Sequence, residues 1–209
     1  MDWQRIVYSV PGVIIGFTIH EYFHAFAAYK LGDTTAKEQG RLTLDPIKHI
    51  DIIGLIFIII AGFGWAKPVQ FNQNMLKNPK RDKAIIAAAG PISNLILGIL
   101  FILLVKVLWT VALSTGSEAV YNVLDYVTNV LFYWSYTNLG LFVFNILPIP
   151  PLDGSHIFLS GINLSPETEN KIMRLGTPLL FLILVIQSRT DYTILPISNI
   201  VEAIISIFF

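Results

Sequence analysis

The residues whose types and spacing could do chemistry stand together near the N-terminus, in the run His20-Glu21-Tyr22-Phe23-His24. Two histidines four residues apart lie on one face of a helix, so both imidazoles can bind the same metal ion. The Glu beside the first histidine can hold a water molecule on that metal and take its proton. The pattern therefore predicts a zinc site suited to hydrolysis, with His20 and His24 as ligands and Glu21 as the general base.

The surroundings of this run favour a functional role. It lies within the hydrophobic residues 7–31, and a charged residue at the centre of a membrane helix costs about 2.5 to 3.5 kcal/mol. A charged residue with so high an insertion cost usually has an interaction partner and a functional role, which favours the metal site. The alternative is a helix end at the membrane interface that carries His and Glu incidentally.

A catalytic zinc usually has three protein ligands and one open position. The remaining histidines are His49 and His156, and the most suggestive carboxylate is Asp153, which follows the proline-rich residues 145–152. Prolines end a helix and Gly154 permits a sharp turn, so Asp153 could face a polar cavity at membrane depth. An ordinary loop with a turn-forming Asp-Gly pair is the alternative, and this segment alone would favour it.

The chain that positions these residues has 209 residues, of which 54% are hydrophobic and 13% are charged. The charged share is about half that of a typical soluble domain, so the bilayer must solvate much of the apolar surface. The net charge is zero, which gives no indication of a nucleic-acid partner, and there is no cysteine for a disulfide or a thiolate site. We expect one membrane-embedded domain over residues 1–209, whose first apolar run is retained because it lacks an Ala-x-Ala cleavage site.

Hydropathy divides the chain into apolar helices separated by polar stretches. We expect an all-α polytopic membrane protein with about five transmembrane helices, at residues 5–30, 81–113, 120–147, 172–186 and 194–209. Residues 52–64 are also apolar, but a helix of this length reaches only about 20 Å, short of the roughly 30 Å hydrocarbon core. A short re-entrant or interfacial segment is therefore expected there, with His49 and Asp51 as its caps.

The proposed ligands must meet at one depth, which orients the helices. His20 and His24 lie in the second half of the first helix and Asp153 lies just beyond the helix at 120–147, so both helices should end on one side. The polar residues 30–51 and 65–83 then share that side and hold nine of the fourteen Lys and Arg residues. The positive-inside rule predicts a multi-pass protein of the cell membrane, with the N-terminus outside and the metal site nearer the cytoplasmic face.

Five motifs occur in a fixed order along the chain. They are HEYFH at residues 20–24, GRLTLDP at 40–46 followed by HID at 49–51, GWAKPV at 64–69, AGPISN at 89–94, and NILPIPPLDG at 145–154. Together they resemble the site-2 protease family of intramembrane zinc metalloproteases, and the resemblance covers most of the chain.

The resemblance implies a site and a substrate class. It implies one zinc ion bound by His20, His24 and Asp153, with Glu21 activating zinc-bound water, and a transmembrane protein substrate cut within or near the bilayer. His156, three residues after Asp153, is an alternative ligand that the resemblance disfavours. The chain departs from many relatives because it has no room for a PDZ insertion or a C-terminal CBS domain, so the choice and regulation of substrates are left open.

Extended and polar residues are candidates for substrate contact. They are Trp65, Lys67, Val69, Asn94 and Asn145. Residues 65–71 alternate modestly and Pro68 suits a sheet edge, so a small membrane-associated β-hairpin could pair with extended substrate; the resemblance points the same way, and a surface loop is the alternative. Alternatively, Asn94 and Asn145 could serve only to form polar contacts between packed helices. Gly90 and Gly98 are expected to allow close approach of helices.

Two other functions compete with this interpretation. A zinc protease of the prenyl-protein type would need a Glu on another helix as third ligand, and the later Glu residues follow no clear inward-facing pattern. A non-proteolytic metal-binding membrane scaffold or transporter would not need a general base, so the intact Glu21 favours a protease. The sequence identifies neither the substrate nor the oligomeric state.

Overall fold

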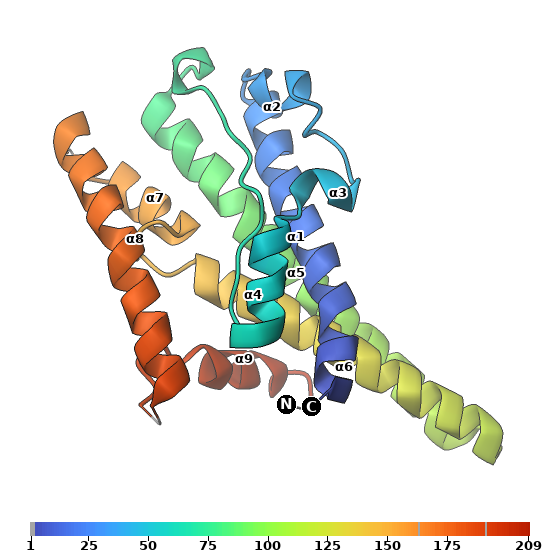
Figure 1. Cartoon of the computed structure of the whole chain (residues 1–209). Helices are drawn as coiled ribbons and strands as arrows, with labels where there is room; N and C mark the ends of the chain where they lie inside the picture. Colours follow the sequence, from blue (N-terminus) through green and yellow to red (C-terminus); the bar gives the residue numbers. More distant parts are fainter. Residues whose placement is uncertain (1–2, 163, 191) are drawn as a thin grey trace.

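The computed structural model describes residues 3–162, 164–190 and 192–209, and over these residues the chain is helical without a β-strand (Figure 1). The expected all-α class is confirmed. The helices, in chain order, are α1 Trp3–Lys30, α2 Thr35–Glu38, α3 Pro46–His49, α4 Ile52–Ala61, the 3-10 turn η1 Gln73–Met75, α5 Pro79–Ser114, α6 Glu118–Asn145, α7 Asp153–Ser160, α8 Pro166–Arg189 and α9 Ile197–Ile205.

The long helices α1, α5 and α6 pack against one another and form the interior (Figure 1). Small residues allow their close contact. A Cβ atom on Gly98 of α5 would lie 2.7 Å from Cγ of the fully buried Leu139 on α6. One on Gly12 of α1 would lie 2.8 Å from Trp134 Cδ1. The expectation that Gly98 permits close helix approach is confirmed.

Three helices are long and apolar enough to cross a membrane: Ile6–Lys30, Pro79–Ser114 and Glu167–Arg189. Large apolar side chains are exposed along the outer faces of α5 and α8, as expected where lipid is the solvent. Among the described residues, these three spans are all that meet both criteria, so about five crossings are not confirmed. Helix α6 has the length, but it carries polar residues along its course, among them Asp125, Asn129 and Asn138.

The last helix is shorter than expected. Helix α9 has nine residues, which rise only about 14 Å, so it is too short to cross the hydrocarbon core. It instead lies across the end of the molecule (Figure 1), where its fully buried Val201 packs with Leu139 and Val143 of α6. The fifth crossing expected at residues 194–209 is therefore not confirmed.

The short apolar segment folds as a helix and a returning chain. Helix α4 begins at a cap in which the Asp51 carboxylate accepts from Gly54 N at 2.9 Å, and it ends at Gly62 with φ 76°. The following residues turn back alongside it, since a Cβ on Gly64 would lie 2.7 Å from Ile58 Cγ1. This shape agrees with the predicted short re-entrant or interfacial segment and with Asp51 as its cap.

The possible β-hairpin is not found. In the described part of the chain, residues 65–71 are extended but form only an isolated antiparallel bridge, between Ile50 and Ala66. Lys67 N donates to His49 O at 2.8 Å beside that bridge. A single bridge lacks the repeated ladder of a hairpin, so we refer to residues 65–71 as the extended segment.

Two helices near the C-terminal end differ from the expected boundaries. Residues 153–160, which lie between the helices expected at 120–147 and 172–186, form α7. Helix α8 begins at Pro166 rather than near residue 172, because Ser165 caps it by accepting from Thr168 N at 3.2 Å and acidic residues occupy its first turn. These signals lie in a polar stretch, where hydropathy does not detect a helix.

Candidate functional site

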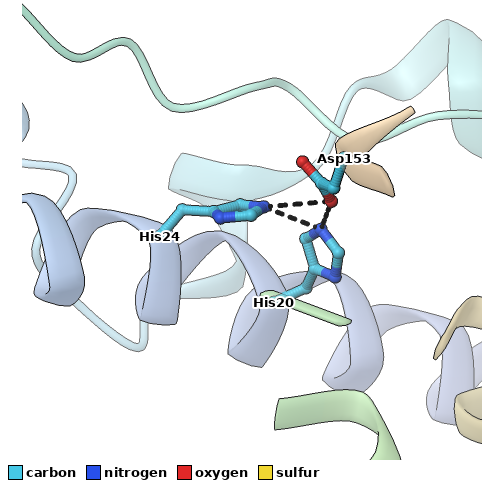
Figure 2. Close-up of side chains that lie close together, drawn as sticks. All are labelled: His20, His24 and Asp153. Carbon is cyan, nitrogen blue, oxygen red and sulfur yellow. Dashed lines mark hydrogen bonds and ion pairs between the residues drawn. The ribbon is translucent and has the colours of Figure 1, made fainter. Parts of the chain in front are cut away.

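The side chains of His20, His24 and Asp153 converge on one point (Figure 2). The two Nε2 atoms lie 2.9 Å apart, and Asp153 Oδ2 lies 3.1 Å from Nε2 of His20 and 3.3 Å from Nε2 of His24. The histidines are one turn apart on α1, and Asp153 is the first residue of α7, more than a hundred residues later. The structure thus brings together the three candidate ligands that the sequence motifs indicate.

Each imidazole ring has a hydrogen bond on the side away from Asp153. These bonds determine which ring nitrogen faces the cluster of three candidate ligand atoms. Nδ1 of His20 lies 2.6 Å from Asn94 Oδ1, and Nδ1 of His24 lies 2.7 Å from the carbonyl oxygen of Ile86. Asn94 Nδ2 donates to Gly16 O at 3.1 Å and to Asn138 Oδ1 at 3.0 Å, which assigns the amide oxygen to the His20 side. Because both partners are acceptors, each Nδ1 carries the proton and each Nε2 presents a lone pair.

The donor set fits a zinc ion. Two imidazole lone pairs and a carboxylate oxygen this close together repel one another, and a cation between them removes that repulsion. Two histidines and one carboxylate form a common ligand set of catalytic zinc, which leaves the fourth position open. His156 is not part of the group of ligand atoms within 4.8 Å of one another among the described residues.

The proline-rich break places Asp153. Helix α6 ends at Asn145 and α7 starts at Asp153, so the intervening turn brings the carboxylate back toward α1. Gly154 fits only without a side chain, because a Cβ there would collide with the carbonyl groups of Ile146 and Leu147. Gly154 is the second residue of α7 and its φ is not positive, so the sharp turn lies at the preceding residues 146–152 and the prediction of a turn at Gly154 itself is wrong. A glycine is needed there because the backbones pack closely.

Gly90 lies directly against the two histidine rings, a role that was not foreseen. A Cβ atom on this residue of α5 would lie 2.6 Å from Nε2 of His20 and 2.6 Å from Cε1 of His24. Sequence reasoning assigned Gly90 only to helix packing. Asn94, in the same motif, lies one turn further along α5 and orients the His20 ring through a hydrogen bond. The AGPISN motif therefore supplies both the residue that packs against the two imidazoles and the residue that orients one of them.

Replacing Gly90 by Ala is expected to weaken zinc binding by about ten- to a hundredfold, because the methyl group displaces the imidazoles. Overpacking costs about 1–3 kcal/mol and outweighs the gain of up to about 1 kcal/mol in helix propensity. Zinc content after dialysis against a chelator measures the effect. Gly140→Ala on α6 is the matched control, since a Cβ there meets no atom within 4 Å. Equal zinc retention in both variants would contradict the assigned contact.

Glu21 is buried beside the ligands, with 7% of its surface exposed. Its Oε2 accepts a hydrogen bond from Val69 N at 2.7 Å, which joins it to the extended segment. This contact spans 48 residues of sequence, and no sequence signal indicates it beyond the expectation that residues 65–71 lie near substrate. The carboxylate is thus held in a fixed position beside the candidate metal ligands.

Arg41 also holds the extended segment, through backbone carbonyl groups that precede Val69. Its guanidinium donates to Lys67 O at 2.6 Å and to Pro68 O at 3.3 Å. His49, fully buried, lies with Nδ1 3.5 Å from the same guanidinium and donates from Nε2 to Thr43 O at 2.7 Å. Burial lowers the pKa of His49 below its usual 6.5, so the ring is neutral at neutral pH and can accept from Arg41. The GRLTLDP motif therefore supports the segment that contacts Glu21.

A cavity of about 410 Å³ opens at the ligands. Glu21, His20, His24 and Asp153 line it together with Trp65, Val69 and Asn145, three of the predicted substrate contacts. The other two lie elsewhere: Asn94 is fully buried behind His20, and Lys67 contributes its backbone to His49 and Arg41.

His156 also lines this cavity, from α7. Its Nδ1 is buried and has no hydrogen-bond partner within the described residues. Burial lowers the pKa of this ring, so it is uncharged at neutral pH. The geometry places His156 beside the ligand group, and not within it.

Comparisons with known proteins agree with this geometry. The family model described as "Peptidase family M50" matches residues 8–185. A protein of Bacillus subtilis (strain 168) named "Putative zinc metalloprotease YwhC" is 38% identical over 200 residues, which cover 92% of this chain and 86% of that protein.

"Putative zinc metalloprotease Rip2" of Mycolicibacterium smegmatis is 30% identical over 168 residues, or 78% of this chain. The matched region spans 60% of Rip2. No solved structure matches the chain. With a family match over most of its length, the chain belongs to peptidase family M50, the site-2 protease family, and is a zinc metalloprotease.

Proposed function

We propose that this protease hydrolyses peptide bonds within or near the transmembrane segments of other membrane proteins, using one zinc ion held by His20, His24 and Asp153. The observation that carries the proposal is the convergence of the three ligand atoms, within 4.8 Å of one another, where two of them belong to α1, a helix of membrane-spanning length and composition. A site at that depth meets substrates that are themselves in or near the bilayer.

The surrounding residues supply the acid–base chemistry. A zinc ion held by these ligands would act as a Lewis acid that polarises the scissile carbonyl and lowers the pKa of water. Glu21 takes a proton from the attacking water as the water oxygen bonds to the carbonyl carbon. It passes the proton to the amide nitrogen as the C–N bond breaks. The Val69 N–H donates to Oε2, which leaves Oε1 to accept from water.

The extended segment is the proposed docking edge for unwound substrate. A peptide bond inside a helix is already hydrogen-bonded, so the substrate must extend before hydrolysis, and pairing with an extended chain satisfies its backbone groups regardless of sequence. Arg41, His49 and Glu21 fix one edge of the segment through its backbone. Successive backbone groups of an extended chain alternate in direction. Arg41 also binds Pro68 O on the opposite edge, so the backbone groups of Ala66 and Gln70 are the ones proposed to pair with substrate, beside Trp65, Val69 and Asn145.

The basic residues near the site support a proposal for the side of the bilayer that it faces. We propose a multi-pass protein of the cell membrane, acting as one domain over residues 1–209, with the N-terminus outside and the active site nearer the cytoplasm. Residues 30–51 and 65–83, which hold nine of the fourteen Lys and Arg residues, lie where α1 ends and α5 begins (Figure 1). The positive-inside rule assigns that side to the cytoplasm.

The test is cleavage by the purified chain in lipid vesicles, with a panel of single-span proteins as substrates and mass spectrometry to locate the cut. Cleavage within or next to the apolar segment is expected, with loss of activity on zinc chelation and recovery on adding zinc. A soluble casein substrate is the control. Cleavage of casein alone, or cleavage that chelation leaves unchanged, would contradict the proposal.

A further inference from the structure

A second cavity, of about 390 Å³, adjoins the catalytic one. The two share a wall made by Phe17, Gly64, Leu141 and Phe144. The second cavity extends from that wall away from the zinc ligands, between α1, α4, α6 and α8. Groups on a substrate bound at the ligands would therefore lie next to it.

The lining of this second cavity selects for apolar groups. None of the described residues that line it is charged, and most are apolar, as Val13, Ile58 and Leu184 are. The polar exception with the longest side chain, Gln187, is already engaged: its Oε1 accepts from Leu195 N at 2.7 Å and from Ile194 N at 3.1 Å, and its Nε2 donates to Leu195 O at 3.3 Å. A polar group bound in this cavity would find few hydrogen-bond partners, whereas an apolar group needs none.

Gly140 keeps the cavity open. It lines the second cavity from α6, and a Cβ atom on it would meet nothing within 4 Å. Other glycines on the long helices behave differently, since a Cβ on Gly12, Gly16 or Gly98 would press against a neighbouring helix. Gly140 is therefore not required for helix packing, and its missing side chain leaves space instead.

We propose that the second cavity binds an apolar side chain of the substrate next to the scissile bond, and that Gly140 sets the size of side chain accepted. The inference rests on the proposed function and names a specificity determinant for it. A substrate residue at the zinc ligands would have its neighbour at the shared wall. The four lining residues that the two cavities share therefore favour a substrate side chain over a lipid tail as the occupant. A volume of about 390 Å³ holds a Leu or Phe side chain with room to spare.

The test fills the cavity stepwise with Gly140→Ala, Gly140→Val and Gly140→Leu. The probes are single-span peptides in micelles that the unmodified chain cleaves, carrying Ala, Leu or Phe on either side of the cut. Gly140→Leu is expected to lower kcat/KM for the Leu and Phe peptides by about tenfold or more, and for the Ala peptide by less than about threefold. Gly140→Ala, which meets no atom, is expected to shift the same ratio in the same direction by a smaller factor, and it covers the case in which the Leu variant does not fold.

The matched control is Ala119→Leu, on the exposed first turn of the same helix, which should leave the preference among peptides unchanged. An equal loss for all three peptides would indicate a lipid or structural role for the cavity and overturn the inference. Unchanged selectivity in every Gly140 variant would overturn it as well. In both cases the unmodified chain still cleaves, so the proposed function stands; absence of any cleavage by the unmodified chain would overturn both together.

Discussion

Replacing Glu21 by Gln is expected to lower the rate of peptide-bond hydrolysis by about a thousandfold or more while leaving the zinc content unchanged. General-base catalysis contributes about 10²–10⁴-fold, and an amide cannot take a proton from water. The amide oxygen of Gln can still accept from Val69 N, which holds the native carboxylate at 2.7 Å, so the local structure is expected to persist. Cleavage of a single-span substrate in vesicles measures the effect.

The same change at Glu118, exposed on the first turn of α6, provides the matched control and should leave the rate unaltered. Zinc content and the thermal midpoint of both variants establish that only the base is lost. Cleavage by the Glu21→Gln variant at a rate near that of the native chain would show that another group takes the proton.

Replacing Asp153 by Ala is expected to reduce zinc affinity by at least about a hundredfold. Loss of an outer hydrogen-bond partner of a ligand typically costs about ten- to a hundredfold, and loss of a ligand should cost no less. The two imidazoles remain oriented by Asn94 and Ile86, but two neutral ligands without a counter-charge hold the dication weakly. Metal content after chelator dialysis and a zinc titration measure the affinity.

Asp125→Ala on α6 removes a carboxylate away from the site and should retain full zinc content. His156→Ala tests the alternative ligand, since this ring lines the same cavity. If the His156 variant lost zinc and the Asp153 variant retained it, the ligand assignment would be wrong.

Prediction from sequence succeeded for features that depend only on residues close together in the chain. The spacing of His20 and His24 requires only the period of a helix, and the observed Nε2 atoms lie 2.9 Å apart. Prolines define the break before Asp153 through their own backbone limits. The short span of α4 and the cap at Asp51 likewise follow from local residues.

Prediction failed where a boundary depends on polar signals or on packing. Residues 194–209 are apolar enough to suggest a crossing, yet α9 ends after nine residues and packs on α6. The extended segment alternates like a strand, but its backbone bonds go to Arg41, His49 and Glu21 instead of to a second strand.

The sequence by itself determined the family, the zinc chemistry and the identity of the candidate ligands. Each of these depends on short motifs, in which particular residue types occur at fixed spacings. Only the tertiary structure decided that Gly90 walls the imidazoles, that Asn94 orients His20, and that Gly140 leaves a second cavity open. Each of those contacts joins residues on different helices, and the distance between two helices depends on how all their side chains pack, which no local pattern encodes.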